Sequence, residues 1–289
     1  MRIVVTTPTG HVGSRVLHLL VQAGVRPVAL LRDPARLDPE LRDRVETVRA
    51  DQTDAGAVRE ATRGADRLFW VNPPAPPDAD PMEQHARAAA AVAEAVTANG
   101  IGFTVFLSSV GAEKRHGAGD IDGLGRTEEA LDATGADVLH LRAGFFFTNL
   151  LLQADDLRNA TLPTPWPLDL PMAWVDPRDI GDVAAARLLA GPGHGRRVQA
   201  VHGPDALTFA EAGTIIGGAT GRTVEVVRIS GADFRAGLSA AGLAPPHVDA
   251  VAGMWEGLSD GFVAEDPRDV TTTTPTTLGA WAHAHLAAL

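Results

Sequence analysis

Short apolar runs alternate with amphipathic stretches through the first half of the chain. The runs are rich in β-branched residues, as expected for strands buried on both faces of a parallel sheet. They cover residues 2–6, 28–31, 45–50, 67–71, 103–107 and 138–141. Between the first two runs, Val12, Val16, Leu19, Leu20 and Ala23 recur at helical spacing. This alternation predicts an α/β fold, a doubly wound parallel sheet with helices on both faces.

Helix and loop signals continue less regularly beyond the first strands. Asp80-Pro81 and Asn99-Gly100 are typical start and stop signals, and they bound an alanine-rich helix. Asp179 is expected to cap a helix that runs to residue 189, and Thr208 and Glu211 match a capping box. We expect loops at 111–125 and, rich in proline, at 162–171, a glycine-rich turn at 191–197, a strand at 224–229, and helices at 126–134, 232–241, 247–258 and 277–289.

The turn after the first strand carries the clearest candidate chemistry. Residues 7–13 read Thr-Pro-Thr-Gly-His-Val-Gly, with Gly10 and Gly13 spaced as G-x-x-G. A strand, a glycine turn and a helix N-terminus together suit the pyrophosphate of a dinucleotide, because free N–H groups and the helix dipole attract it. The full G-x-G-x-x-G fingerprint is incomplete, since Thr7 and Pro8 stand where a further glycine is expected. A purely structural turn is the alternative.

Composition and charge exclude several classes of function. The net charge of −11 argues against binding to a nucleic-acid backbone, which rests on lysine and arginine. The absence of cysteine excludes disulfides and thiolate nucleophiles, and no cluster has metal-ligand spacing. No apolar run approaches the roughly 18 residues of a membrane span, and the start lacks a signal peptide, so we expect a cytoplasmic protein. The chain has no tyrosine, and Lys114 is its only lysine, so a catalytic Tyr–Lys pair is impossible.

Ligands of doubly wound sheets bind outside the carboxyl ends of the strands. By that rule one crevice is ringed by Gly10, Arg32, Gln52, residues 72–74, Ser108 and residues 144–147.

Several segments, in order, resemble the NmrA-like branch of the atypical short-chain dehydrogenases. The chain is similar both to bacterial NADPH-dependent quinone oxidoreductases and to ergot-alkaloid reductases of that branch. The matching segments are residues 9–13, 31–34, 69–74, 106–111, 141–146 with Asn149, and 175–180. The resemblance implies a Rossmann-like NADP(H)-binding core over residues 1–150, with returning segments around 172–203. Residues 151–289 would mostly form a smaller α/β substrate-binding lobe.

The resemblance also implies which residues hold the cofactor, NADP(H) in preference to NAD(H). They are Thr7, Thr9, Gly10, His11, Val12, Gly13, Arg32, Gln52, Asn72, Pro73, Pro74, Ser108, Gly144, Phe145 and Phe147. Arg32 follows the second strand, where its guanidinium would fork onto the 2′-phosphate, whereas an acidic residue would select NADH. Asp33 is one step further on, and a solvated surface charge is the alternative interpretation of Arg32.

The substrate side is marked by aromatic residues. The predicted pocket comprises Ser109, Phe146, Phe147, Asn149, Trp166, Trp174 and Trp255. Ordinary core packing is the alternative for each aromatic member. Many relatives place a lysine, histidine or tyrosine on the helix after the fifth strand, but the region around Leu124 offers none. Ser108, Ser109 and Lys114 remain as candidate catalytic groups.

Without a Tyr–Lys pair, the acceptor must need little acid catalysis. We expect an NADPH-dependent oxidoreductase that transfers a hydride to a small conjugated or aromatic acceptor, such as a quinone, enone or imine. The alternative is a non-catalytic NADP(H)-binding sensor of the NmrA type, and an epimerase-like use of the cofactor ranks last. The expected partner is a small-molecule substrate, with neither nucleic acid nor membrane, and the protein would be a monomer or homodimer.

Overall fold

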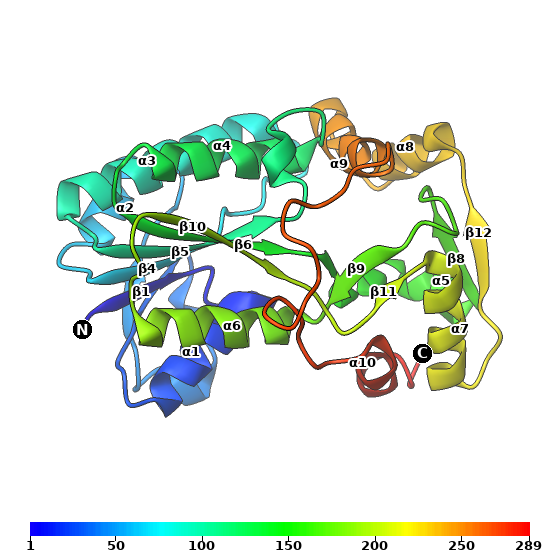
Figure 1. Ribbon diagram of the computed structural model, residues 1–289, viewed down its shortest axis with the longest axis horizontal. Coiled ribbons are helices and arrows are strands. Elements are labelled where there is room, and N and C mark those ends of the chain that lie inside the picture. Colours follow the sequence, from blue (N-terminus) through cyan, green and yellow to red (C-terminus); the bar gives the residue numbers. More distant parts are fainter.

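A seven-stranded parallel sheet runs through the computed structural model, which describes residues 1–289 (Figure 1). The strand order is β10-β6-β5-β4-β1-β2-β3, and every neighbouring pair is parallel. The strands are β1 (Ile3–Thr6), β2 (Val28–Leu31), β3 (Glu46–Arg49), β4 (Arg67–Trp70), β5 (Phe103–Ser109), β6 (Asp137–Ala143) and β10 (Arg196–Val201). This arrangement confirms the predicted Rossmann-like α/β fold.

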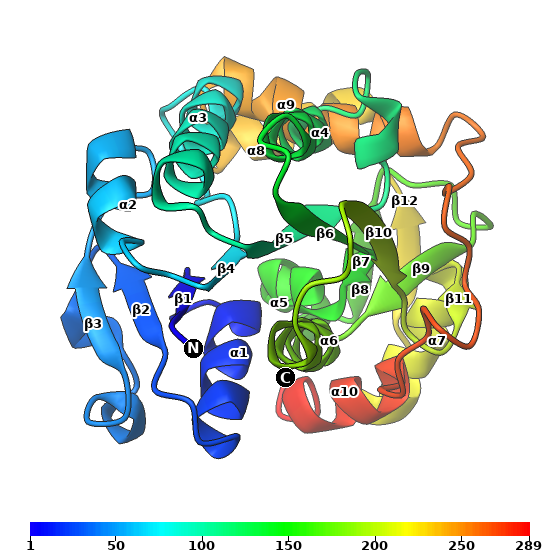
Figure 2. The ribbon, with the colours of Figure 1, turned by 60° about the vertical axis from the view of Figure 1, so that its left-hand side comes forward.

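Helices cover both faces of this sheet (Figure 2). On one face lie α1 (His11–Gln22) and α6 (Pro177–Ala190), and on the other lie α2 (Ala55–Ala61), α3 (Pro81–Asn99) and α4 (Asp120–Asp132). Val12, Val16 and Leu20 of α1 are buried at helical spacing against the sheet. Burial of such side chains stabilises the fold by roughly 1.5–3 kcal/mol each. No helix has both the length and the apolar content needed to span a membrane.

The remaining elements form a lobe beyond the carboxyl ends of the strands (Figure 1). Its core contains Phe147, Trp174, Phe209 and Trp281. Its strands are β7 (Phe145–Phe146), β8 (Thr161–Thr164), β9 (Met172–Val175), β11 (Ala206–Leu207) and β12 (Glu225–Arg228), and its helices are α5 (Ala154–Arg158), α7 (Phe209–Thr220), α8 (Gly231–Ala240), α9 (Pro245–Leu258) and α10 (Leu278–His285). Short 3₁₀ turns are η1 (Pro34–Arg36), η2 (Pro39–Leu41), η3 (Ala112–Lys114) and η4 (Phe147–Gln153).

Two predicted helix starts were wrong. Helix α6 begins at Pro177 and is capped by Asp176, whose carboxylate accepts a hydrogen bond from Arg178 N at 2.9 Å. The Asp179 carboxylate instead accepts from Thr276. Helix α4 begins at Asp120, within the predicted loop, because tertiary packing outweighs the low helix propensity of Gly123, which lies against the His85 ring.

Two segments differ from their predicted loops and turns. Residues 162–164 of the proline-rich stretch lie in β8, which pairs in parallel with β12, a partner more than 60 residues away. The glycine-rich turn at 191–197 leads directly into β10, which extends the main sheet beside β6. Both pairings depend on distant partners, so no local pattern marks them.

Candidate functional site

The carboxyl edge of the sheet brings the predicted crevice residues together in strand order. Gly10 follows β1, Arg32 follows β2 and Gln52 follows β3. Residues 72–74 follow β4, Ser108 is the second-last residue of β5 and Gly144 follows β6. Because these six strands are adjacent and parallel, their ends form one continuous edge from Gln52 to Gly144.

The turn after β1 leaves hydrogen-bond donors free at the start of α1. Gly10 N donates to the Thr7 carbonyl at 3.0 Å, and Gly10, the N-cap, has no side chain to satisfy the next N–H groups. The N–H groups of His11, Val12 and Gly13 therefore lack partners inside the helix. A Cβ on Gly13 would lie 2.3 Å from the Thr7 oxygen, so only glycine lets the helix approach this closely. The turn thus fits a dinucleotide pyrophosphate.

Arg32 is free to bind an anion at the end of β2. Its side chain is exposed and forms no ion pair. The neighbouring Asp33 carboxylate accepts from Ala35 N at 3.0 Å and caps η1. Burial raises the pKa of Asp51, but hydrogen bonds from Thr53 and the positive charge of Arg32 outweigh it and lower the pKa.

Gln52 and Asn72 use their amides within the protein. Gln52 Nε2 donates to the Val71 carbonyl at 2.7 Å. Asn72 Oδ1 accepts from Trp70 Nε1 at 2.9 Å, which fixes the amide so that Nδ2 faces His85 Nδ1 and Thr127 Oγ1, both at 2.8 Å. Both Asn72 amide hydrogens are therefore occupied, and its side chain has no donor left for a cofactor ribose.

Each candidate catalytic group is engaged in a structural hydrogen bond. Ser108 Oγ donates to Glu128 Oε1 at 2.7 Å, and Ser109 Oγ donates to the Val110 carbonyl at 2.9 Å. Lys114 Nζ lies 2.6 Å from the Gly257 carbonyl and 2.7 Å from Asp260 Oδ2. The two serine hydroxyls each donate their one proton inside the protein, and the Lys114 ammonium is held by two acceptors that use two of its three N–H groups.

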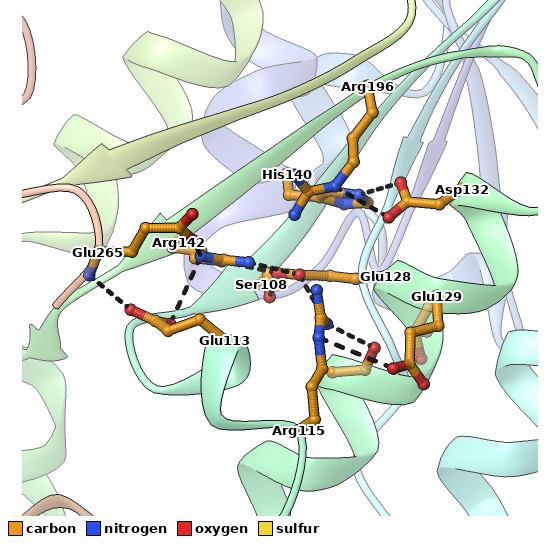
Figure 3. Close-up of polar contacts among 12 residues, drawn as sticks. Ser108, Glu113, Arg115, Glu128, Glu129, Asp132, His140, Arg142, Arg196 and Glu265 are labelled. Atoms are coloured by element: carbon orange, nitrogen blue, oxygen red, sulfur yellow. Dashed lines mark hydrogen bonds and ion pairs between the residues drawn. The ribbon is translucent and has the colours of Figure 1, made fainter. Parts of the chain in front are cut away.

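Ser108 belongs to a buried ion network that joins strands β5 and β6 to helix α4 (Figure 3). Arg142 Nε and Nη2 hold the two oxygens of Glu128 at 2.9 and 2.8 Å. Arg142 Nη1 reaches Glu265 at 2.7 Å, and Arg115 reaches Glu128 at 2.9 Å. Through the contact between Arg142 and Glu265, the network holds the segment around Glu265 against the end of β6.

The charges of this network are fixed by its geometry. Burial raises the pKa of Glu128, but the hydrogen bonds from Arg142 and the nearby positive charges outweigh burial and lower it to about 2. Burial likewise lowers the pKa of Arg142, yet its bonds to Glu128 raise it overall. Sequence reasoning missed this pair as a unit. The available signal was Arg142 itself, a charge that directly follows the apolar run 138–141.

The predicted aromatic residues divide into core and crevice members. Trp174 is fully buried and donates from Nε1 to the Leu207 carbonyl at 2.8 Å. Phe145 packs edge-on against Trp174 at 4.8 Å and Trp166 at 6.5 Å between ring centroids. Phe147 is buried against Trp281 at 5.7 Å. Trp166, Trp174, Phe147 and Trp281 belong to the core of the lobe, and Phe145 packs against them.

Three residues of the predicted substrate pocket keep part of their surface exposed. Phe146, Asn149 and Trp255 are half-buried, and Asn149 forms no side-chain hydrogen bond. Trp255 Nε1 is buried without a partner. A Cβ on Gly144 would lie 2.2 Å from the Ala173 carbonyl, so this glycine permits the close packing of β9.

A polar cavity beside α1 was not predicted from the sequence. It has a volume of about 350 Å³ and is lined by His11, Ser14, Arg15, His18, Thr148, Asp176, Pro177, Arg178, Trp281 and His285. Burial raises the pKa of Asp176 at its wall. The signal was the spacing of His11, Ser14, Arg15 and His18 along one face of α1.

Comparisons with known proteins agree with this geometry. A family profile described as NAD(P)H-binding matches residues 8–149. The chain is 30% identical to an NAD(P)H azoreductase from Xenophilus azovorans over 99% of this chain and 98% of that protein. It is 26% identical to quinone oxidoreductase 2 from Escherichia coli, over 98% of each chain.

Solved structures share the fold over the whole chain. The NADPH complex of quinone oxidoreductase QOR2 from Escherichia coli has a TM-score of 0.78 at 24% identity, covering 99% of both chains. The NADP(H) complex of triphenylmethane reductase from Citrobacter sp. has a TM-score of 0.77 at 21% identity, again over 99% of both chains.

The pyrophosphate-type turn, the parallel sheet and the full-length similarity to named reductases agree. The predicted resemblance is thereby confirmed, and an enzyme is favoured over a non-catalytic sensor. The chain belongs to the NAD(P)H-binding, NmrA-like branch of the atypical short-chain dehydrogenases and is an NAD(P)H-dependent oxidoreductase.

Proposed function

We propose that this protein reduces a small conjugated or aromatic acceptor, such as a quinone, enone or imine, with NADPH. The observation that carries the proposal is that the hydroxyl protons of Ser108 and Ser109 are donated inside the protein, and that Lys114 Nζ is held by the Gly257 carbonyl and Asp260. The chain also has no tyrosine that could replace them.

Acceptor classes differ in how much they need a catalytic proton donor. A saturated ketone develops alkoxide charge during reduction, and a positioned acid typically contributes about 10² to 10⁴-fold to its rate. A quinone spreads the incoming charge over its ring, and an iminium ion is already positive. For these acceptors, holding the reactants at near-attack distance supplies much of the acceleration. The azo and quinone reductases among the relatives are consistent with such acceptors.

Different residues at the carboxyl edge would bind different parts of the dinucleotide. The free N–H groups after Gly10 would hold the pyrophosphate, and Arg32 would hold the 2′-phosphate that distinguishes NADPH from NADH. The bound nicotinamide supplies a hydride. Gly144 and Phe145 would flank the nicotinamide.

The lobe would complete the pocket over that position. We place the acceptor between the main parallel sheet and the lobe, with Phe146, Asn149 and Trp255 as its contacts. Their half-buried positions and the unused amide of Asn149 support this placement. A flat aromatic acceptor would exclude water by stacking against Phe146 or Trp255.

A panel of acceptors, with a saturated ketone as the control, tests the proposal. Steady-state oxidation of NADPH is measured with 1,4-benzoquinone, cyclohexenone, a cyclic imine and saturated cyclohexanone. We expect at least one conjugated or imine acceptor to turn over with kcat/KM at least 100-fold above cyclohexanone. Turnover of cyclohexanone at an equal rate would reveal an acid that these contacts do not show and would overturn the proposal.

A further inference from the structure

Thr7 has a backbone conformation that its side chain disfavours. Its φ is 45°, in the left-handed region that suits glycine. Only two other non-glycine residues share a positive φ, Arg115 and Ala160. Thr7 is β-branched and precedes Pro8, and the residue before a proline favours extended backbone. Both features oppose the observed conformation.

The surrounding turn imposes this conformation. The Thr7 carbonyl accepts from Gly10 N at 3.0 Å, and Gly13 packs directly against the same carbonyl. Pro8 is buried, so the turn has no freedom to relax outward. Glycine at position 7 would adopt the same backbone without strain. The chain therefore carries a threonine where the local geometry favours glycine.

The hydroxyl of Thr7 is free, unlike that of its neighbour. Thr6 Oγ1 donates to the Phe69 carbonyl at 3.1 Å and accepts from Val71 N at 2.9 Å. Thr7 is half-buried, and its hydroxyl forms no hydrogen bond in the protein. It belongs to the same seven-residue turn as the unpartnered N–H groups of His11, Val12 and Gly13.

We propose that Thr7 is a cofactor-binding residue whose hydroxyl donates a hydrogen bond to a phosphate oxygen of the dinucleotide. This inference rests on the proposed placement of the pyrophosphate on the turn. A phosphate oxygen suits this donor because it is anionic, and hydrogen bonds to charged acceptors are stronger than neutral ones. The strain at Thr7 is retained in exchange for this contact.

Four variants separate the hydroxyl from the backbone strain. Thr7→Val keeps the branched shape and loses the donor, Thr7→Ser keeps the donor, and Thr7→Gly loses the donor and relieves the strain. Ala160→Gly relieves a matched positive φ of 57° in the lobe, away from the turn. The dissociation constants of NADPH and NADH and the Tm of the cofactor-free protein are measured for each.

We expect Thr7→Val and Thr7→Gly to weaken binding of both dinucleotides about ten-fold or more, and Thr7→Ser to restore binding to within three-fold of the parent. Thr7→Gly and Ala160→Gly should both raise Tm by about 2–4 °C, while Ala160→Gly leaves both dissociation constants unchanged. Should Thr7→Val fail to fold, the Thr7→Gly and Thr7→Ser pair decides the question.

Dinucleotide binding by Thr7→Gly that equals or exceeds the parent would overturn the inference. Failure of this inference about Thr7 is distinguishable from failure of the proposed function. NADPH and NADH share the pyrophosphate, so a loss of the expected NADPH preference or of quinone turnover leaves this comparison intact.

Discussion

Ser108 Oγ lies 2.7 Å from Glu128 Oε1, and the serine is the donor because the carboxylate can only accept. Glu128 is fully buried between Ser108 and Arg142, and its pKa is about 2. It is therefore ionised at neutral pH and accepts the hydrogen bond that Ser108 donates. Ser108, next to the end of β5, thus binds α4 through Glu128 and supplies no proton to the crevice.

Ser108→Ala should leave catalysis nearly intact. Because the hydroxyl is turned to Glu128, kcat with a quinone should fall by less than three-fold. Tm should fall by about 2–4 °C, since about 1 kcal/mol of buried hydrogen bonding is lost. Ser109→Ala, which removes only a bond to a neighbouring carbonyl, is the control. A 100-fold loss of kcat at unchanged Tm would instead make Ser108 the proton donor.

Glu128 should dominate the acid stability of the fold. Its pKa falls from 4.5 to about 2 on folding, so its stabilisation is complete above pH 4.5 and is lost as the pH falls toward 2. The shift corresponds to about 3 kcal/mol. The free energy of unfolding, measured between pH 2 and 7, should therefore drop steeply below pH 4.5.

The variant Glu128→Gln isolates this contribution. It should lower the free energy of unfolding at pH 7 by about 3 kcal/mol, because buried Arg142 loses the carboxylate that pairs with its Nε and Nη2 and keeps only Glu265 and Glu113 at Nη1. The acid-dependent drop should shrink by a similar amount. Glu129→Gln, one residue on and exposed, should change neither. An unchanged pH profile in Glu128→Gln would assign the acid sensitivity to other groups.

Gly13→Ala should damage both the fold and cofactor binding. The added Cβ would lie 2.3 Å from the Thr7 oxygen, so the helix must move away from the turn. We expect a loss of about 1–3 kcal/mol in stability and at least ten-fold weaker NADPH binding. Gly218→Ala in α7 meets nothing within 4 Å and should instead stabilise by about 0.5–1 kcal/mol. Equal Tm values for the two variants would refute the close approach.

Local patterns predicted the fold because its strands carry their own signal. β2 was predicted at its observed bounds, and Asp80 and Gly100 cap α3 as expected. Both depend on residues adjacent in sequence. The crevice order followed from the rule that ligands bind at the carboxyl edge of a parallel sheet.

Other features depend on contacts between distant segments. Arg142 and Glu265 are 123 residues apart. The partners β8 and β12 are also distant in sequence, so their pairing could not be predicted from local patterns. The side chain of Asn72 was expected to bind the cofactor, but Trp70, His85 and Thr127 take up its amide. Its partners come from three elements, so the sequence could place the backbone of Asn72 but not the direction of its amide.

The central claim is that Arg32, at this edge of the sheet, makes the protein prefer NADPH to NADH. The ratio of kcat/KM for NADPH to that for NADH tests this claim most directly. With a quinone acceptor, we expect the parent to prefer NADPH by at least ten-fold, because charge-assisted hydrogen bonds to the 2′-phosphate contribute about 1.5–3 kcal/mol. Arg32→Ala should bring the ratio close to one. Arg26→Ala, an exposed arginine before the opposite end of β2, should leave the ratio unchanged. An unaltered preference in Arg32→Ala, or a parent that favours NADH, would contradict the account.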